Sequence, residues 1–255
     1  KHVQLQLKNG PLIHLLYDPK TANKSNWEKI QRGYLQDYFD FMAEHFGTYP
    51  YKQFSIIQGG DGGMEYPMCT MMLGGGDSFE GFTGLFVHEA THNWYYGVIG
   101  TNEAAYPWMD EGFTSYAEEE FMNTVFYGNE LNPHLSAYRS YVYLDTSGIR
   151  EPLSTPADHF LFNRTYSINS YSAGALFLNQ LEYIIGEGPF AKGMKNYWNK
   201  WQFKHPKPED FLRVMEEVSD IELDWYLSYY KDQVKSIDYG VEEVKNIQAG
   251  AQITL

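Results

Sequence analysis

Two short stretches of the sequence carry the residues best suited to chemistry. His88 and His92 are four residues apart, and Glu89 directly follows the first histidine. Positions i and i+4 of an α-helix lie on one face, so both imidazoles can bind a single metal ion with the Glu89 carboxylate nearby. Eighteen residues separate His92 from Glu111, a third candidate ligand. Two histidines and one carboxylate predict a zinc site with a fourth position open for water, which is typical of catalytic zinc.

The competing interpretation is a solvated helix, because a His-Glu-x-x-His run also occurs by chance. The residues before the run favour the metal. Phe82, Leu85 and Phe86 recur at helical spacing, which places the imidazoles on or beside a buried face. A polar group without a partner is costly there. A second helix is expected to begin at Glu111, and two facing helices that present these three side chains are best explained by an ion.

Composition indicates a packed globular protein that can bury a large core. The chain has 255 residues, of which 43% are hydrophobic and 17% aromatic. Nineteen Lys and Arg against 33 Asp and Glu give a net charge of −14, which argues against nucleic acid or an anionic membrane as partner. We expect no membrane insertion, because no long uncharged apolar run is present. The single cysteine, Cys69, excludes an internal disulfide.

The elements that position the two stretches follow from periodicity and from turn residues. Alternation over residues 1–17, broken by Asn9-Gly10, predicts a β-hairpin. Further strands are expected at 53–58 and within 64–73, and alternation returns from residue 237. Helical patterns are found at 26–46, with a capping box of Ser25 and Glu28, and at 78–97, 111–127, 132–145, 169–185, and in segments that begin at 189, 208 and 223. Strands followed by many helices predict an α+β fold, a small mixed sheet packed on a mostly helical body.

The sequence resembles the aminopeptidase-N family of gluzincins, which includes leukotriene hydrolase. His-Glu-Ala-Thr-His at 88–92 and Glu-Gly-Phe-Thr-Ser-Tyr at 111–116 carry the likeness together with two further motifs. Gly-Gly-Met-Glu-Tyr at 62–66 is similar to the family's Gly-x-Met-Glu-Asn exopeptidase motif, and Tyr-Ser-Ala-Gly-Ala at 171–175 to its Tyr-x-x-Gly-Ala helix start. The resemblance covers nearly the whole chain and implies a thermolysin-like catalytic domain.

The resemblance implies a role for each matched position. His88, His92 and Glu111 would bind one Zn²⁺, and Glu89 would be the base that takes a proton from the attacking water and passes it to the leaving amine. Tyr171 would donate its hydroxyl to the tetrahedral oxyanion. From composition alone, Tyr171 could equally be one more core aromatic among 22 tyrosines.

The same likeness implies a substrate site for peptides with a free N-terminus. Glu65 would hold the α-amine, and Gly62, Gly63 and Met64 would let an extended peptide add to the strand edge. Tyr66 replaces the usual Asn, which puts the fine geometry of this site in doubt. Two further assignments come from position along the chain. Tyr166 is expected to line the pocket, and Asp110 and Glu118 are candidate acceptors for the ligand imidazole N–H groups.

The resemblance also predicts a division of the chain. Residues 1–20 would be the exit strands of a preceding β domain, 21–236 the thermolysin-like domain, and 237–255 the first strands of a following β-sandwich. The end strands are expected to lack partners, and catalysis to be weakened, because the family draws a second amine-binding side chain from the preceding domain. Likeness to bacterial members with Gly-Gly-Met-Glu-Tyr-Pro favours a periplasmic or cell-envelope location.

Two other functions compete with a zinc aminopeptidase. One is a related hydrolase, either a thermolysin-like endopeptidase or a hydrolase of lipid epoxides; an endopeptidase has no need of Glu65 beside the metal. The other is a non-catalytic binding module that keeps the fold. Such a module would be free to lose Glu89 and Tyr171, and both are present. Cobalt or manganese would fit the same ligands as zinc.

Overall fold

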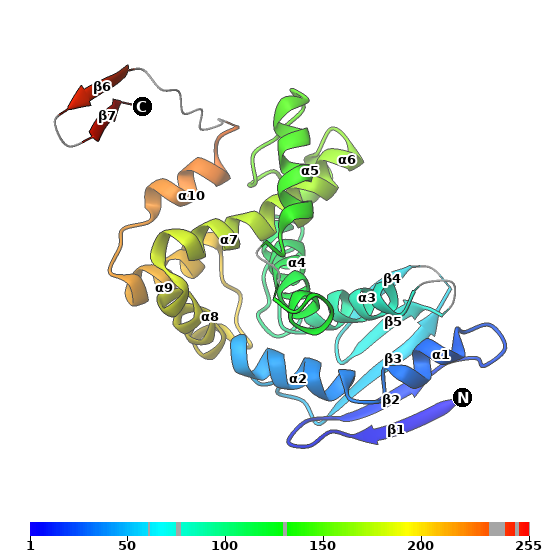
Figure 1. The fold of residues 1–255 in the computed structure, drawn as a ribbon. Helices are drawn as coiled ribbons and strands as arrows, with labels where there is room; N and C mark the ends of the chain where they lie inside the picture. The colour runs from blue at the N-terminus through cyan, green and yellow to red at the C-terminus, as the bar shows by residue number, and fades with distance from the viewer. Residues whose placement is uncertain (61, 75–77, 130–131, 235–242, 248–249, 255) are drawn as a thin grey trace.

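The computed structural model describes residues 1–60, 62–74, 78–129, 132–234, 243–247 and 250–254. A five-stranded sheet lies at one side and a helical body at the other, with α3 and α4 between them (Figure 1). The strands are β1 (His2–Gln6), β2 (Leu12–Leu16), β3 (Gln53–Gly59), β4 (Gly63–Tyr66), β5 (Cys69–Leu73), β6 (Glu243–Ile247) and β7 (Gly250–Thr254). The α-helices are α1 (Lys24–Lys29), α2 (Tyr34–His45), α3 (Phe79–Thr91), α4 (Trp108–Met122), α5 (Leu135–Thr146), α6 (Asn163–Ser167), α7 (Gly174–Ile185), α8 (Glu187–Trp201), α9 (Pro208–Ser219) and α10 (Asp224–Lys231). Short π- and 3₁₀-helices join them: η1 (Asn123–Tyr127), η2 (Ala157–His159) and η3 (Ile168–Ala173). The predicted α+β fold is confirmed.

The sheet is mixed, in the order β1-β2-β3-β5-β4. β2, β3 and β5 are parallel neighbours, and antiparallel β1 and β4 form the two edges. The expectation that residues 1–17 lack a partner is wrong, because Leu12–Leu16 pairs with β3 in the same sheet. That residues 1–20 follow another domain stays a prediction. The edge strand β4 carries Glu65, and among the described residues no strand pairs with its outer side.

One face of the sheet is buried, as alternation along its strands requires. Ile13, Leu15, Phe54 and Ile56 lie on this face and are at most 1% exposed. The helices α1, α2 and α3 cover it: Phe39 of α2 packs edge-on against Phe54, and Trp27 of α1 contacts Phe82 of α3. The sheet therefore fixes α3, the helix that holds the histidines.

Two predicted helices differ from those observed. The single helix expected at 26–46 is broken between α1 and α2, because Gly33 has φ +112° and a helix cannot continue through that conformation. The capping box is also absent: α1 begins after Asn23, and Glu28 lies 3.6 Å from both Lys1 and Lys24.

The helix expected at 78–97 ends at Thr91, with His92 as its last, capping residue. The chain then doubles back, and a Cβ added to Gly97 would lie 2.9 Å from the Asn93 Cα atom. Asn93 accepts a hydrogen bond of 2.7 Å from the Met68 N–H in the β4–β5 turn. The end of α3 is therefore tied to the strand that carries Glu65.

Towards the C-terminus, β6 and β7 form a separate antiparallel pair. Residues 237–242, 248–249 and 255 of the predicted β-sandwich segment lie outside the described residues. The assignment of this segment to a following domain stays a prediction.

Helices α4 and α7 cross with their backbones in contact. A Cβ on Gly112 would lie 2.5 Å from the Gly174 Cα atom, and a Cβ on Gly174 would lie 2.7 Å from the Gly112 Cα atom and 3.1 Å from the Trp108 carbonyl oxygen. Both glycines belong to the matched motifs: Gly112 directly follows Glu111, and Gly174 lies three residues after Tyr171. The crossing thus holds these two side chains at a fixed distance.

Replacing Gly174 by Ala is expected to lower the free energy of unfolding by about 2–3 kcal/mol, because the added methyl meets backbone atoms that cannot turn aside. Urea unfolding of the two proteins checks this. Gly188→Ala on α8 is the matched control, since its Cβ would meet nothing within 4 Å. Equal stability of the two alanine variants would contradict the prediction.

A buried polar contact joins α4 to the start of α5. His134 is fully buried, its Nε2 lies 2.9 Å from Glu120 Oε1, its Nδ1 contacts Glu119, and its ring stacks on Tyr116. Burial alone would lower the pKa of His134, but the two carboxylates raise it to about 9. The protonated imidazole therefore stabilises this corner of the fold.

The stability that His134 contributes should depend on pH. Its pKa is about 9 in the folded chain and about 6.5 when unfolded. The contribution is fully present below pH 6.5 and is lost as the pH rises towards 9. We expect the difference in unfolding free energy between the natural chain and His134→Gln to shrink by about 2–3 kcal/mol over this range. Urea unfolding of both proteins in the presence of a chelator measures it, and a difference that stays constant would contradict the prediction.

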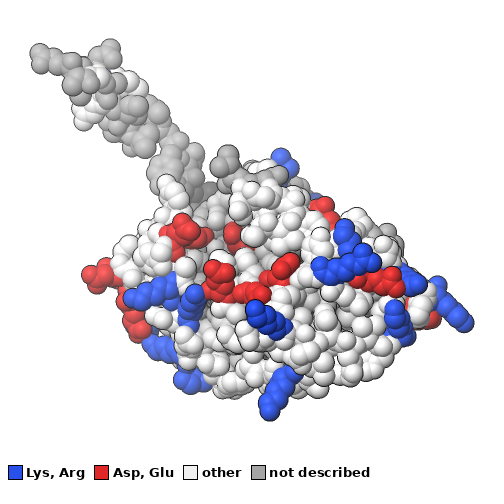
Figure 2. Space-filling view, turned by 60° about the horizontal axis from the view of Figure 1, so that its bottom comes forward, with Lys and Arg blue, Asp and Glu red and all other residues white. Residues whose placement is uncertain are grey.

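The surface carries mixed charge on the face shown in Figure 2, where acidic and basic side chains are interspersed. Within the described residues, no helix combines the length and the apolar character needed to cross a bilayer.

Candidate metal centre and catalytic site

The three predicted metal ligands converge on one point between α3 and α4. His88 Nε2 lies 3.3 Å from His92 Nε2, and each of these atoms lies 3.3 Å from Glu111 Oε2. Both histidines come from the last turn and the end of α3, and Glu111 from the first turn of α4. The three donor atoms therefore form a nearly equilateral triangle.

This triangle fits a zinc ion. Ligand atoms at about 2.0–2.1 Å from a tetrahedral zinc are about 3.3–3.4 Å apart. Glu111 Oε2 is buried and has no hydrogen-bond partner in the described structure, which is costly unless a cation binds there. Without a bound metal, burial opposes both shifts, yet contacts with Glu111 and Glu118 raise the pKa of His88 to about 9 and contacts with the histidines lower the pKa of Glu111 to about 2. A zinc ion would take the place of the Nε2 proton between these groups.

A carboxylate is hydrogen-bonded to the Nδ1 atom of each of the two imidazoles. His88 Nδ1 lies 2.9 Å from Glu118 Oε2, and His92 Nδ1 lies 2.5 Å from Asp110 Oδ1. Carboxylates can only accept, so each ring donates from Nδ1 and keeps the Nε2 lone pair for the metal. The two acceptors predicted from the sequence are thus brought to the two rings.

The Glu89 side chain extends from α3 towards β4. It is 7% exposed, and a Cβ added to Gly63 would overlap its carboxylate, so the absence of a side chain at 63 leaves room for it. Oxygen atoms of Glu65 and Glu89 and a ring nitrogen of His92 lie within 4.8 Å of one another. Burial raises the pKa of Glu89 to about 7, although the nearby histidines oppose this. A pKa near neutrality suits a group that accepts and returns a proton.

Tyr171 contacts two of the predicted metal ligands, Glu111 and His88. Its hydroxyl donates a 2.6 Å hydrogen bond to Glu111 Oε1, and its ring stacks on His88 with an interplanar angle of 8°. Burial raises the pKa of Tyr171 far above its usual value, so the hydroxyl remains a donor at neutral pH. The predicted regular helix over 169–185 begins instead with the π-helix η3, which contains Tyr171. Such π-helical turns are frequent at functional sites.

The remaining predicted substrate residues do not all face α3. Gly63 and Glu65 point towards α3, whereas Met64, which is 45% exposed, lies on the opposite face of β4. Gly62 leads into β4 with φ +27°. Tyr166 in α6 packs edge-on against Phe160, and burial together with the Glu111 charge raises the pKa of its hydroxyl.

Three residues of the site were not predicted from the sequence. Thr114 Oγ1 lies 3.4 Å from His92 Nδ1, and Asn93 holds the β4–β5 turn. Glu103 lies in the segment between α3 and α4, with a carboxylate oxygen within 4.8 Å of Glu65 and Asp110. Thr114 belongs to the Glu-Gly-Phe-Thr-Ser-Tyr motif at 111–116 but was assigned no role, and Asn93 and Glu103 belong to no recognised motif. Only the position of Asn93, next to a ligand, could have indicated it.

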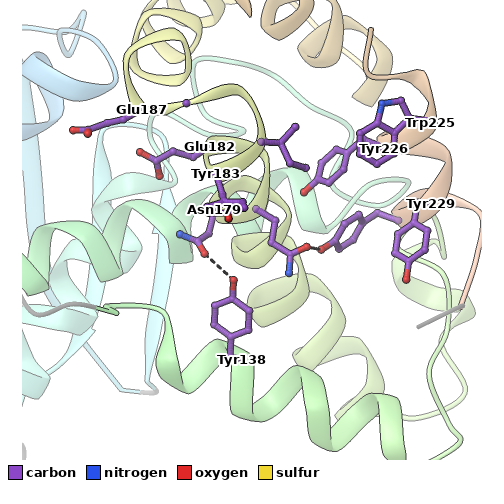
Figure 3. Close-up of a pocket in the computed structure, with 12 residues that line it drawn as sticks. Tyr138, Asn179, Glu182, Tyr183, Glu187, Trp225, Tyr226 and Tyr229 are labelled. Atoms are coloured by element: carbon purple, nitrogen blue, oxygen red, sulfur yellow. Dashed lines mark hydrogen bonds between the residues drawn. The ribbon is translucent and has the colours of Figure 1, made fainter. Parts of the chain in front are cut away.

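A separate cavity of about 890 Å³ lies among α5, α7 and α10 and holds none of the predicted site residues. Aromatic side chains dominate its lining, and Tyr138 donates a 3.0 Å hydrogen bond to Asn179 there (Figure 3).

The sequence is similar to those of known aminopeptidases. The chain is 23% identical to aminopeptidase B of Rattus norvegicus over 94% of its own length, and 25% identical to glutamyl aminopeptidase of Sus scrofa over the same share. It spans 36% and 27% of the lengths of these relatives.

Solved structures share the fold. An M1 zinc metallopeptidase from Deinococcus radiodurans is similar with a TM-score of 0.70 at 17% identity, covering 93% of this chain and 52% of that one. Leukotriene A4 hydrolase from Saccharomyces cerevisiae gives a TM-score of 0.65 at 18% identity, covering 90% and 39%. The family model described as the peptidase family M1 domain matches residues 33–230. The chain therefore belongs to peptidase family M1.

Proposed function

We propose that this chain is a zinc-dependent aminopeptidase that removes N-terminal residues from peptides. The observation that carries the proposal is the triangle of three donor atoms 3.3 Å apart, with Glu89 beside it and Glu65 on the adjoining strand. The family match and the aminopeptidases among the relatives support it. His88, His92 and Glu111 would hold the zinc. The ion would polarise the scissile carbonyl and lower the pKa of the attacking water.

Glu89 would move the proton. Its carboxylate lies against Gly63 of β4 and near His92, so it borders the space in which a substrate carbonyl and water would meet. It would accept the proton of the attacking water and give it to the leaving amine, a shuttle that a pKa near neutrality favours in both directions.

Tyr171 would stabilise the oxyanion. Its single hydroxyl proton points at Glu111 Oε1, on the ligand group. As negative charge develops on the carbonyl oxygen, the hydroxyl would turn to donate there. The turn gives up the hydrogen bond to Glu111, but the hydroxyl already lies beside the ligand group in a partly buried site, where a donor to the oxyanion contributes strongly.

Glu65 would make the enzyme an exopeptidase. It faces α3 from the edge strand β4, whose open side can pair with an extended peptide. A carboxylate at this place would hold the α-ammonium group and align the first peptide bond with the metal. An acetylated N-terminus carries no charge for Glu65 to hold.

The test compares hydrolysis of an aminoacyl chromogenic amide and its N-acetylated twin by the zinc-loaded chain, each with and without a chelator. We expect cleavage of the free amine alone, abolished by the chelator. Cleavage of both amides would indicate an endopeptidase. A zinc-loaded chain that cleaves neither would contradict the proposed catalysis.

A further inference from the structure

Four rings follow one another across the metal centre. Tyr171 stacks on His88 with ring centroids 5.6 Å apart, and the His88 ring meets the His92 ring edge-on at 4.9 Å. The His92 ring meets Tyr96 edge-on at 6.1 Å. Within the described part of the chain, Tyr96 has no ring contact with His88. The two tyrosines therefore lie at opposite ends of the series, and only Tyr171 has a role in the proposed mechanism.

The backbone of Tyr96 has a conformation that a tyrosine rarely adopts. Its φ is +79°, in the left-handed region where a bulky residue is crowded. The surrounding loop enforces this angle: the Tyr96 N–H donates to the Ile99 carbonyl over 3.1 Å, and the Gly97 N–H donates to the His92 carbonyl over 2.9 Å. Backbone strain of this kind is found mostly at functional sites.

The Tyr96 side chain lies against the C-terminal end of β4. A gap between the end of α3 and residues 65–67 is lined by Tyr96 and His92, and it is too narrow for a water molecule. Burial and the charge of Glu65 raise the pKa of Tyr96, as expected for a hydroxyl close to a carboxylate. Tyr96 therefore closes the space between the helix that carries the histidines and the strand that carries Glu65.

A peptide bound along the edge of β4 would meet this contact with its N-terminal end. In the proposed complex the first peptide bond lies near Glu89, which faces Gly63, and the α-ammonium group lies near Glu65. The peptide would then run antiparallel to β4, from Glu65 towards Gly63. Because each residue of a strand advances about 3.3 Å, a residue added before the first would lie beside residues 66–67, in the space that Tyr96 fills.

We propose that Tyr96 is the wall that ends the substrate cleft one residue before the scissile bond, and that it restricts cleavage to the removal of single amino acids. This inference rests on the proposed aminopeptidase function. Attraction of the α-ammonium group favours a peptide that begins at Glu65, and a ring in the path of the preceding residue rejects a peptide that extends further. Specific sites commonly combine such an attractive and a repulsive element.

The test uses the zinc-loaded chain and the variants Tyr96→Gly and Tyr96→Phe. Glycine removes the ring and adopts a positive φ without strain, so urea unfolding should show a folded chain. Phenylalanine keeps the ring and loses only the hydroxyl. Phe203→Gly is the matched control, because Phe203 also has a positive φ, +61°, but is 60% exposed and lies outside the described site.

The substrates are a leucyl and an alanyl-leucyl chromogenic amide, and the products are identified by mass spectrometry at low conversion. Intact alanyl-leucine forms only when the bond after the second residue is cut directly. We expect the natural chain, Tyr96→Phe and Phe203→Gly to release free amino acids. Tyr96→Gly should raise the ratio of dipeptide to alanine at least about tenfold, the effect of removing a steric clash from a packed site.

Three results would overturn the proposal while leaving metal-dependent peptide hydrolysis intact. Tyr96→Gly could release no more dipeptide than Phe203→Gly, Tyr96→Phe could release as much as Tyr96→Gly, or Tyr96→Gly could lose its zinc together with leucyl amide hydrolysis. The last result would mean that the ring supports His92. A natural chain that cleaves neither amide would contradict the proposed function itself, so the two failures are told apart by the activity of the natural chain.

Discussion

Replacing Glu89 by Gln is expected to lower kcat by about a thousandfold, the usual contribution of a general base in a positioned pair, while the zinc content stays at one ion per chain. The amide keeps the size of the side chain, so it still fits between α3 and Gly63. It cannot take up the proton of the attacking water. Metal binding should persist because the ligand atoms belong to His88, His92 and Glu111.

The measurement is single-substrate kinetics on an aminoacyl chromogenic amide, beside metal analysis of the same samples. Glu44→Gln, which removes an equal charge from the exposed face of α2, is the matched control. Activity within tenfold of the natural chain would mean that another group takes the proton. Loss of zinc together with activity would mean that Glu89 supports the metal instead.

The chemistry of this site could be predicted from the sequence where it depends on local spacing. His88, Glu89 and His92 lie on one helix, so their relative placement follows from helical geometry alone. Glu111 requires two helices to meet, and the helical run that begins at Glu111, together with the chemistry of two imidazoles and a carboxylate, indicated that they do. The acceptors Asp110 and Glu118 lie on the same helix as Glu111 and could be assigned with it.

Residues that reach the site from irregular segments could not be predicted in this way. Glu103 stands in a turn whose flanking residues Gly100 and Ala104 form backbone hydrogen bonds with Lys204 and Ala157, which lie 104 and 53 residues further along the chain. Met64 shows the reverse case: its motif placed it near the substrate, but alternation along β4 turns it to the other face.

The predicted helix boundaries were wrong where a glycine or a tertiary contact overrode the hydrophobic periodicity. The hydrophobic pattern runs through Gly33 and through Asn93, yet φ +112° at the first and the tie to the Met68 N–H at the second end the helices. The second break bears on the site, because the Asn93 contact fixes the end of α3 against the turn that follows the strand carrying Glu65. Local periodicity contains no information about such contacts.

Replacing Tyr171 by Phe is expected to lower kcat about a hundred- to a thousandfold with little change in KM, because the oxyanion that the hydroxyl meets exists only in the transition state. The ring would still stack on His88, so the packing of η3 against α3 should survive. Tyr183→Phe on α7, where the side chain is 90% exposed, is the matched control.

A second measurement separates this role from support of the metal, since Tyr171 also donates to Glu111 Oε1. A phosphinic analogue of the tetrahedral intermediate should bind the variant more weakly by the same factor as kcat falls, whereas an amino acid amide should bind as before. An unchanged zinc affinity would complete this pattern. If zinc affinity falls and kcat recovers at saturating zinc, then Tyr171 acts by holding Glu111, and the oxyanion donor must be sought elsewhere.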